Sequence, residues 1–261
     1  MISYLATYTT KKKSAIIEQI LFRVCFIIST VSVFFLTIEN ITGGKMEVFT
    51  QLNANSSELA LSFIQCILGM ISLYIPIIIE KITGIKLPNI LKCFFYIFVL
   101  FATVLGEVCS LYYIIPWWDN LLHISSGIML GMFGGILLID FFKKKKCENL
   151  ISPMFFAAII VCFAVCVGVV WEIYEFAGDS LLGLNMQKFI LQDGTALIGQ
   201  VALIDTMTDL ILDSIGSIVA AISAYSSLKH KRGWLYSYLN PNLIKLNRKL
   251  AIEKETLPHS A

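Results

Sequence analysis

Six apolar stretches constrain the fold of this chain more than any other feature. They cover residues 16–38, 59–79, 91–111, 121–142, 151–176 and 207–226, and each is close to the roughly 20 residues that a helix needs to cross a bilayer. Charged residues make up only 15% of the 261 residues, and no soluble domain fits between the apolar stretches. The sequence therefore predicts an all-α fold, a polytopic bundle of six transmembrane helices.

Basic residues mark alternate connections between these stretches. They precede the first stretch, separate the second from the third, and follow the fourth and the sixth: Lys11, Lys12, Lys13, Lys81, Lys86, Lys92, Lys143, Lys144, Lys145, Lys146, Lys229, Lys231 and Arg232. By the positive-inside rule these connections lie in the cytoplasm, which makes both termini cytoplasmic. We expect a transmembrane domain over residues 1–228 and a basic cytoplasmic juxtamembrane tail over residues 229–261.

Two segments outside the spans also carry predictions. The connection 177–204 is too short for a domain but contains apolar runs, so we expect it to re-enter the membrane in part or to lie on it as a lid. The tail contains apolar residues at near-helical spacing around residues 243–250. This pattern predicts an interfacial helix on anionic lipid, or alternatively a tail that docks a partner.

The sixth stretch carries three carboxylates on an otherwise apolar helix. Asp205, Asp209 and Asp213 follow one another at intervals of four residues, so they lie near one face of the helix. Charged groups are costly inside a bilayer and usually serve a function there. We therefore take this face as the centre of the candidate site.

The fourth and fifth helices repeat this arrangement of polar and small residues. In the fourth helix Asp119 and His123 precede a glycine stripe of Gly127, Gly131 and Gly135, again at intervals of four. In the fifth helix Ala164, Gly168 and Glu172 follow the same spacing in the opposite direction along the chain. Small residues allow helices to approach closely in a membrane. We expect the three helices to pack by these stripes and to bring their polar ends together in the outer half of the bundle.

Acidic residues outnumber basic ones at that end of the bundle. Two possible bases, His123 and Lys188, face eight acids: Glu107, Asp119, Glu172, Glu175, Asp179, Asp205, Asp209 and Asp213. The excess predicts protonated carboxyls, a bound divalent cation or a cationic ligand. An acid cluster that only fixes helix register by hydrogen bonds is a fourth reading, and the outermost acids Asp119, Asp179 and Asp205 could instead face water.

One imidazole with several carboxylates suits Mg²⁺, Mn²⁺ or Zn²⁺ by ligand type. The candidate ligands are Asp119, His123, Glu172, Glu175, Asp209 and Asp213. The candidate catalytic residues are His123, Glu172 and Asp209, with a metal that activates water or a hydroxyl and with His123 or Glu172 as general base.

The same residues resemble two groups of bacterial multi-pass membrane proteins. The order Asp119-x3-His123, Glu172-x2-Glu175, Asp209-x3-Asp213-x2-Gly216 resembles VanZ-like proteins, in which amides stand where this chain has Glu175 and Asp213. The stretch Asp205-Thr206-x2-Asp209 is similar to the YjdF-like family. The resemblance covers helices four to six and implies a bacterial plasma-membrane protein whose working part is a polar site in the outer leaflet.

Three functions are compatible with these observations. The first is an enzyme that acts on a lipid or an envelope precursor, with a lipid-linked substrate as its partner in the bilayer. The second is a non-enzymatic protein that binds or transports a cation, a proton or a cationic amphiphile. The third is a VanZ-like envelope accessory protein. We expect no nucleic-acid partner, and the oligomeric state stays open.

Overall fold

The computed structural model describes residues 2–42, 56–147, 152–191 and 194–240. Within these residues six helical segments are long and apolar enough to cross a membrane, namely Lys13–Glu39, Ser62–Thr83, Asn89–Val108, Trp118–Lys144, Pro153–Leu182 and Gly199–Lys229. The prediction of an all-helical bundle with six spans is confirmed, and the protein is a multi-pass membrane protein. The predicted tail helix around residues 243–250 lies outside the described residues.

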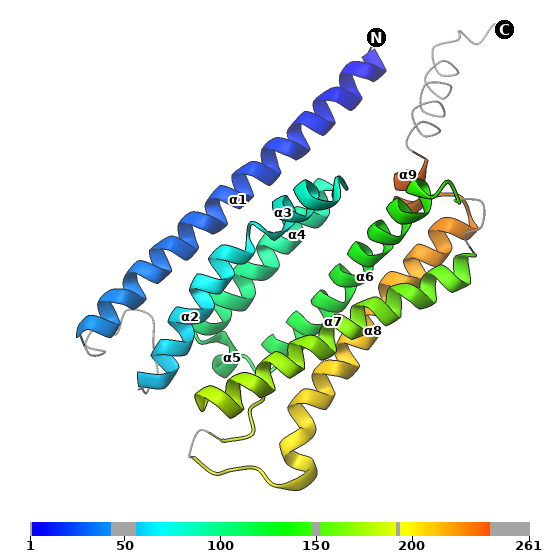
Figure 1. Ribbon diagram of the computed structural model, residues 1–261. Coiled ribbons are helices and arrows are strands. Elements are labelled where there is room, and N and C mark those ends of the chain that lie inside the picture. The colour runs from blue at the N-terminus through cyan, green and yellow to red at the C-terminus, as the bar shows by residue number, and fades with distance from the viewer. Residues whose placement is uncertain (1, 43–55, 148–151, 192–193, 241–261) are drawn as a thin grey trace, which may run out of the picture.

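The spans form two groups that lie side by side (Figure 1). The first group contains α1 (Ile2–Thr42), α2 (Ser56–Ser72), α3 (Ile75–Thr83), α4 (Asn89–Leu100) and the π-helix η1 (Phe101–Val108). The second group contains α6 (Trp118–Lys144), α7 (Pro153–Leu182) and α8 (Ile204–Lys229). Short helices join or cap them: α5 (Leu111–Ile114), the 3₁₀-helix η3 (Gly199–Leu203) and α9 (Trp234–Leu239). The groups contact each other mainly through α4 and η1 against α6.

The second and third spans are less regular than the sequence pattern predicts. The second span is divided between α2 and α3, and Pro76 occupies the first turn of α3, where its missing N–H costs no helical hydrogen bond. The third span changes from α4 into η1, and the chain then turns at Ser110 with φ 57°. Single π-helical turns often mark functional sites. This one carries Glu107 into the space between the two groups.

The second group packs by the predicted stripes of small residues. A Cβ atom on Gly127 would collide with the backbone of α8 at Asp213, and one on Gly216 would collide with the backbone of α6 at Ile124. A Cβ on Gly131 would lie 2.6 Å from that of Ala220. These glycines allow α6 and α8 to approach backbone to backbone, which side chains larger than hydrogen would prevent. Gly135 departs from the pattern, because it faces Ile160 and α9 rather than α8.

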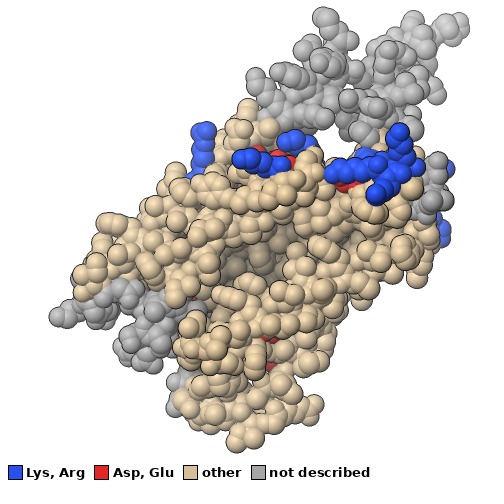
Figure 2. All heavy atoms as spheres, in the orientation of Figure 1, with Lys and Arg blue, Asp and Glu red and all other residues tan. Residues whose placement is uncertain are grey.

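Basic side chains gather at one end of the molecule (Figure 2). The chain starts at this end with α1, and α9 lies at the same end (Figure 1). We call it the lysine end, and the opposite end of α6, α7 and α8 the acid end. Within the segment predicted as a tail, α9 packs on the bundle, with Leu235 fully buried and the Trp234 indole N–H donating to Ser223 Oγ at 3.0 Å. The assignment of the lysine end to the cytoplasm stays a prediction.

Candidate functional site

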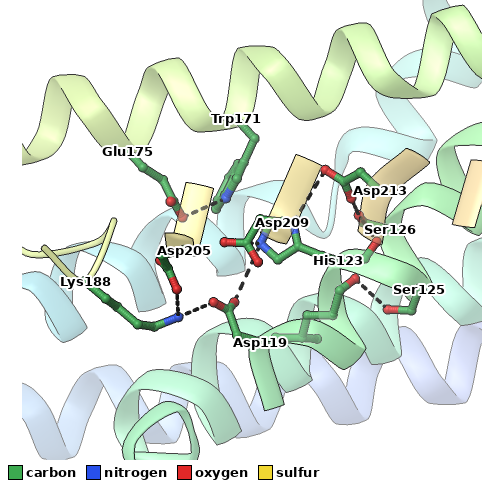
Figure 3. Close-up of polar contacts among 11 residues, drawn as sticks. Asp119, His123, Ser125, Ser126, Trp171, Glu175, Lys188, Asp205, Asp209 and Asp213 are labelled. Carbon is green, nitrogen blue, oxygen red and sulfur yellow. Dashed lines mark hydrogen bonds and ion pairs between the residues drawn. The ribbon is translucent and has the colours of Figure 1, made fainter. Parts of the chain in front are cut away.

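Side chains of α6 and α8 converge near the acid end (Figure 3). His123 Nε2 lies 3.6 Å from Asp119 Oδ1 and 3.7 Å from Asp209 Oδ2. One donor atom from each of these three residues lies within 4.8 Å of the other two. Two donors that each lie about 2 Å from one metal ion are separated by at most about 4 Å, so small side-chain shifts would bring all three onto one ion.

The burial of these groups is costly without a charge partner. Asp209 is 1% exposed, and its Oδ2 has no hydrogen-bond partner among the described residues. His123 is also buried, while Asp119 is half-buried. A buried carboxylate oxygen without a hydrogen bond favours either a proton or a bound cation.

Asp213 approaches the other nitrogen of the imidazole. Its Oδ2 lies 3.5 Å from His123 Nδ1, and its Oδ1 accepts a hydrogen bond from Ser126 Oγ at 2.6 Å. A Cβ atom on Gly168 of α7 would collide with the same carboxylate, so the glycine makes room for it. A histidine that ligates a metal usually donates its second N–H to a carboxylate that orients the ring. Asp213 is in the position for that role, with Ser126 holding it.

Lys188 enters the site from the loop between α7 and η3. Its Nζ donates to Asp119 Oδ2 and, at 2.9 Å, to Asp205 Oδ1. Burial acts to lower the pKa of Lys188, but the charges of Asp119 and Asp205 and the hydrogen bonds to them outweigh burial and raise the pKa above its ordinary value. The lysine therefore stays charged and already supplies one cation to the acid end.

The acids of α7 occupy separate environments. Glu175 Oε1 accepts a hydrogen bond of 2.9 Å from Trp171 Nε1. Glu172 is 5% exposed, and neither of its carboxylate oxygens has a hydrogen-bond partner among the described residues. Asp179 is buried and accepts hydrogen bonds from the backbone N–H groups of Met186 at 2.7 Å and Gln187 at 3.0 Å. Asp179 thus fixes the loop immediately before Lys188.

A cavity of about 540 Å³ lies between the two helix groups, and Asp119, His123 and Asp213 of the candidate site line it. Its polar wall contains Glu107, Asp119, His123, Glu175, Lys188 and Asp213. The rest of its wall is largely apolar and includes Ile75, Phe95, Phe98, Val99, Met129 and Leu130. Figure 2 shows a hollow in this face of the molecule, within a belt that has no basic side chains.

The structure separates the six residues that the sequence singled out as metal ligands. Asp119, His123 and Asp209 converge, and Asp213 contacts the other nitrogen of the imidazole. Glu175 bonds to Trp171, and Glu172 is buried outside the cluster of three. Of the three acids that could face water, Asp179 is buried and bonds to backbone N–H groups. Asp119 and Asp205 stay partly exposed and pair with Lys188.

Two polar contacts of the site were not anticipated. Ser126 and Trp171 bond to Asp213 and Glu175, but their positions in the sequence lie beside the stripes rather than on them. A serine three residues after a candidate histidine ligand lies near the same helix face, which is the only signal the sequence offered for Ser126.

Comparison with known proteins places these features in a family. Residues 46–230 match the family described as predicted membrane protein DUF2238. An uncharacterised protein of Thermotoga maritima is 28% identical over 160 residues, which cover 61% of this chain and 74% of that protein. No solved structure matches the chain.

Proposed function

The chain belongs to the DUF2238 family of predicted membrane proteins, and we propose that it is a divalent-metal-dependent bacterial plasma-membrane protein that acts on a lipid or a lipid-linked envelope precursor. The convergence of Asp119, His123 and Asp209 carries the proposal, and Asp119 and His123 also line the cavity within the spans. One imidazole and two carboxylates suit Zn²⁺, Mn²⁺ or Mg²⁺.

In this proposal each polar residue of the site has a distinct part. Asp119, His123 and Asp209 hold the ion, and Asp213 orients His123 through Nδ1. When bound, the ion supplies a Lewis acid that polarises a phosphoryl or carbonyl oxygen and activates water. Glu172 is the carboxylate that we assign as general base, because it is buried and interacts electrostatically with His123.

Metal analysis tests this function directly. We expect protein purified without chelator to contain a stoichiometric amount of a divalent metal, and the Asp209→Asn and His123→Ala variants to lose it. Asp140→Asn is a matched control, since Asp140 lies on α6 at the lysine end and pairs with Lys144 at 2.9 Å. A parent protein that neither retains nor takes up Zn²⁺, Mn²⁺ or Mg²⁺ would contradict the proposal.

A second candidate function is the binding of a cationic ligand without chemistry. The ammonium group of Lys188 supports it, since this cation lies between Asp119 and Asp205 in the place where a ligand amine could be accepted. Under this alternative the Asp209→Asn variant would lose affinity for an amine such as a long-chain alkylammonium, and the parent would hold no metal.

A further inference from the structure

The cavity has polar side chains toward the acid end and apolar side chains deeper in the span, as a phospholipid has a polar head group and apolar chains. We infer that it is a lateral binding site for a phospholipid whose head group carries an ammonium group. The inference extends the proposed function, because the phosphate of this lipid is assigned to the metal held by Asp119, His123 and Asp209.

The first argument is the direction of the cavity along the helices. On α6 the polar residues Asp119 and His123 come first, and Met129 and Leu130 lie deeper in the span. On the third span Phe95 and Phe98 lie deep, and the chain reaches Glu107 only near the acid end. A lipid of the leaflet at the acid end has the same orientation, with its head group at that end and its acyl chains toward the middle of the bilayer.

The second argument is access. The cavity lies between the two helix groups, with Leu68 of α2 and Val167 of α7 in its wall. Figure 2 shows the hollow opening in the uncharged belt of the molecule rather than at the basic end. A volume of about 540 Å³ is in the range of about 300–1,000 Å³ that is typical of small-molecule sites. It accommodates part of a lipid while the remainder stays in the bilayer.

The third argument is the charge and the aromatic content of the polar end. Lys188 forms ion pairs with Asp119 and Asp205, but neither Glu107 nor Glu175 forms a salt bridge with a lysine or arginine in the described part of the chain. Trp171 and Tyr174 line the cavity beside Glu175, with ring centroids 5.2 Å apart. Carboxylates together with indole and phenol rings attract an ammonium group by charge and by cation–π interaction.

These charges also argue against a purely anionic lipid. A phosphate can be held by the metal, but an additional negative group would share the cavity with the carboxyl groups of Glu107 and Glu175. A zwitterionic head group satisfies both halves of the site, with its phosphate on the metal and its ammonium group against the remaining carboxylates.

Blocking the cavity tests the inference. Val167→Trp fills part of the cavity from its α7 side. Val170→Trp is the control, because it introduces the same side chain one turn away, at a position that is 59% exposed and outside the cavity wall. Leu68→Trp fills part of the cavity from α2. Ile64→Trp is its control, because Ile64 is not in the cavity wall and both parent side chains are 46% exposed. The protein is reconstituted in vesicles of dioleoyl phosphatidylethanolamine and phosphatidylglycerol, extracted in mild detergent and analysed for bound lipid by native mass spectrometry.

We expect the parent and both controls to retain phosphatidylethanolamine in preference to phosphatidylglycerol, and both filled variants to lose it. Glu175→Gln, which keeps the oxygen that accepts from Trp171, should reduce the preference for the ammonium lipid about tenfold, which corresponds to 1.4 kcal/mol. Equal retention of the two lipids, or retention unchanged in Val167→Trp and Leu68→Trp, would overturn the inference.

The result separates this inference from the proposed metal function. Stoichiometric metal without bound lipid would leave the metal centre and overturn the lipid site. Bound phosphatidylethanolamine that both filled variants lose, in a parent that takes up no metal, would support the lipid site and overturn the metal function.

Discussion

The two helix groups bury their residues in different ways. In the second group α6 and α8 meet through glycines that lie against backbone atoms, and half of the most apolar part of α6 is buried. In the first group large side chains such as Tyr96, Leu73 and Leu36 fill the contacts, and only 22% of the corresponding part of α1 is buried. The second group therefore holds most residues of the site on closely packed helices, and the first group covers one side of the cavity.

The family match includes the second group and all of the first group except α1. It begins at residue 46, so α1 lies outside it, whereas all of α6, α7 and α8 lie within it or end at its boundary. The part of the molecule that the match includes is the part that forms the cavity and the cluster of Asp119, His123 and Asp209. The difference between the groups can be tested at three levels.

The largest effect is expected from glycine substitution. Gly127→Leu should yield no folded protein, and Gly127→Ala should destabilise by about 1–3 kcal/mol or more, because the new Cβ meets the α8 backbone, which cannot move aside. Gly69→Ala in α2 is the matched control. Its Cβ would meet the side chain of Thr103 rather than backbone, and the better helix propensity of alanine, about 0.5–1 kcal/mol, offsets part of that contact, so we expect a smaller loss of stability than for Gly127→Ala.

Thermal unfolding in detergent, followed by tryptophan fluorescence and size-exclusion chromatography, measures both variants. Similar unfolding temperatures for Gly127→Ala and the parent would show that the close approach of α6 and α8 is not needed for stability. The proposed contrast between the two groups would then be wrong.

The next effect concerns the carboxylate behind His123. Asp213→Asn should weaken metal binding about 10–100-fold, because the amide keeps the acceptor for Ser126 but loses the charge that orients the imidazole. Glu80→Gln, which alters an ion pair with Lys92 in the first group, should leave metal affinity unchanged. Calorimetric titration with Zn²⁺ or Mn²⁺ measures both, and equal affinities for parent and Asp213→Asn would remove Asp213 from the site.

The smallest effect is expected from two lysines that each bridge two acids. Lys188 joins Asp119 and Asp205 at the acid end, and Lys92 joins Glu18 and Glu80 in the first group. Lys188→Met should tighten metal binding about five-fold, because it removes an ammonium group that competes with the metal for Asp119. The ion pair that is lost contributes about 1 kcal/mol. Lys92→Met should reduce thermal stability without changing metal affinity.

The difference in metal affinity between Lys188→Met and the parent should depend on pH in a defined direction. The pKa of Lys188 is raised in the folded protein, so the contribution of its ion pairs is complete below the unfolded value of about 10.4 and is lost only as the pH rises through the higher folded value. The ratio of metal affinities between Lys188→Met and parent should stay constant from about pH 7 to 9. A ratio that falls toward unity in that interval would show that Lys188 loses its proton there.

The helix count and the glycine contacts could be predicted from the sequence because both follow from local spacing. A span needs a fixed length, and residues four apart share a helix face, so Gly127 and Asp213 could be assigned to an interface before their contact was known. The division of the second span had a signal as well, since Pro76 is most easily accommodated in the first turn of a helix.

Other parts of the site depend on geometry between segments. Lys188 was identifiable as a base, but its bridge to Asp119 and Asp205 depends on a loop that Asp179 holds through two backbone N–H groups. The π-helix that carries Glu107 has no sequence pattern of its own. Whether Glu172 or Asp209 reaches His123 is decided by the crossing of α6, α7 and α8, which spacing along a single helix does not determine.

Asp213 belongs to helix packing and to the site at once, since Gly127 of α6 and Gly168 of α7 both leave space for it. Replacing this aspartate by a longer acid would force apart the helices that hold the imidazole, so ligand preference cannot be redesigned by exchanging side chains one at a time. Variants with new specificity should instead arise from paired changes, in which a shorter residue at position 213 accompanies alanine at position 168.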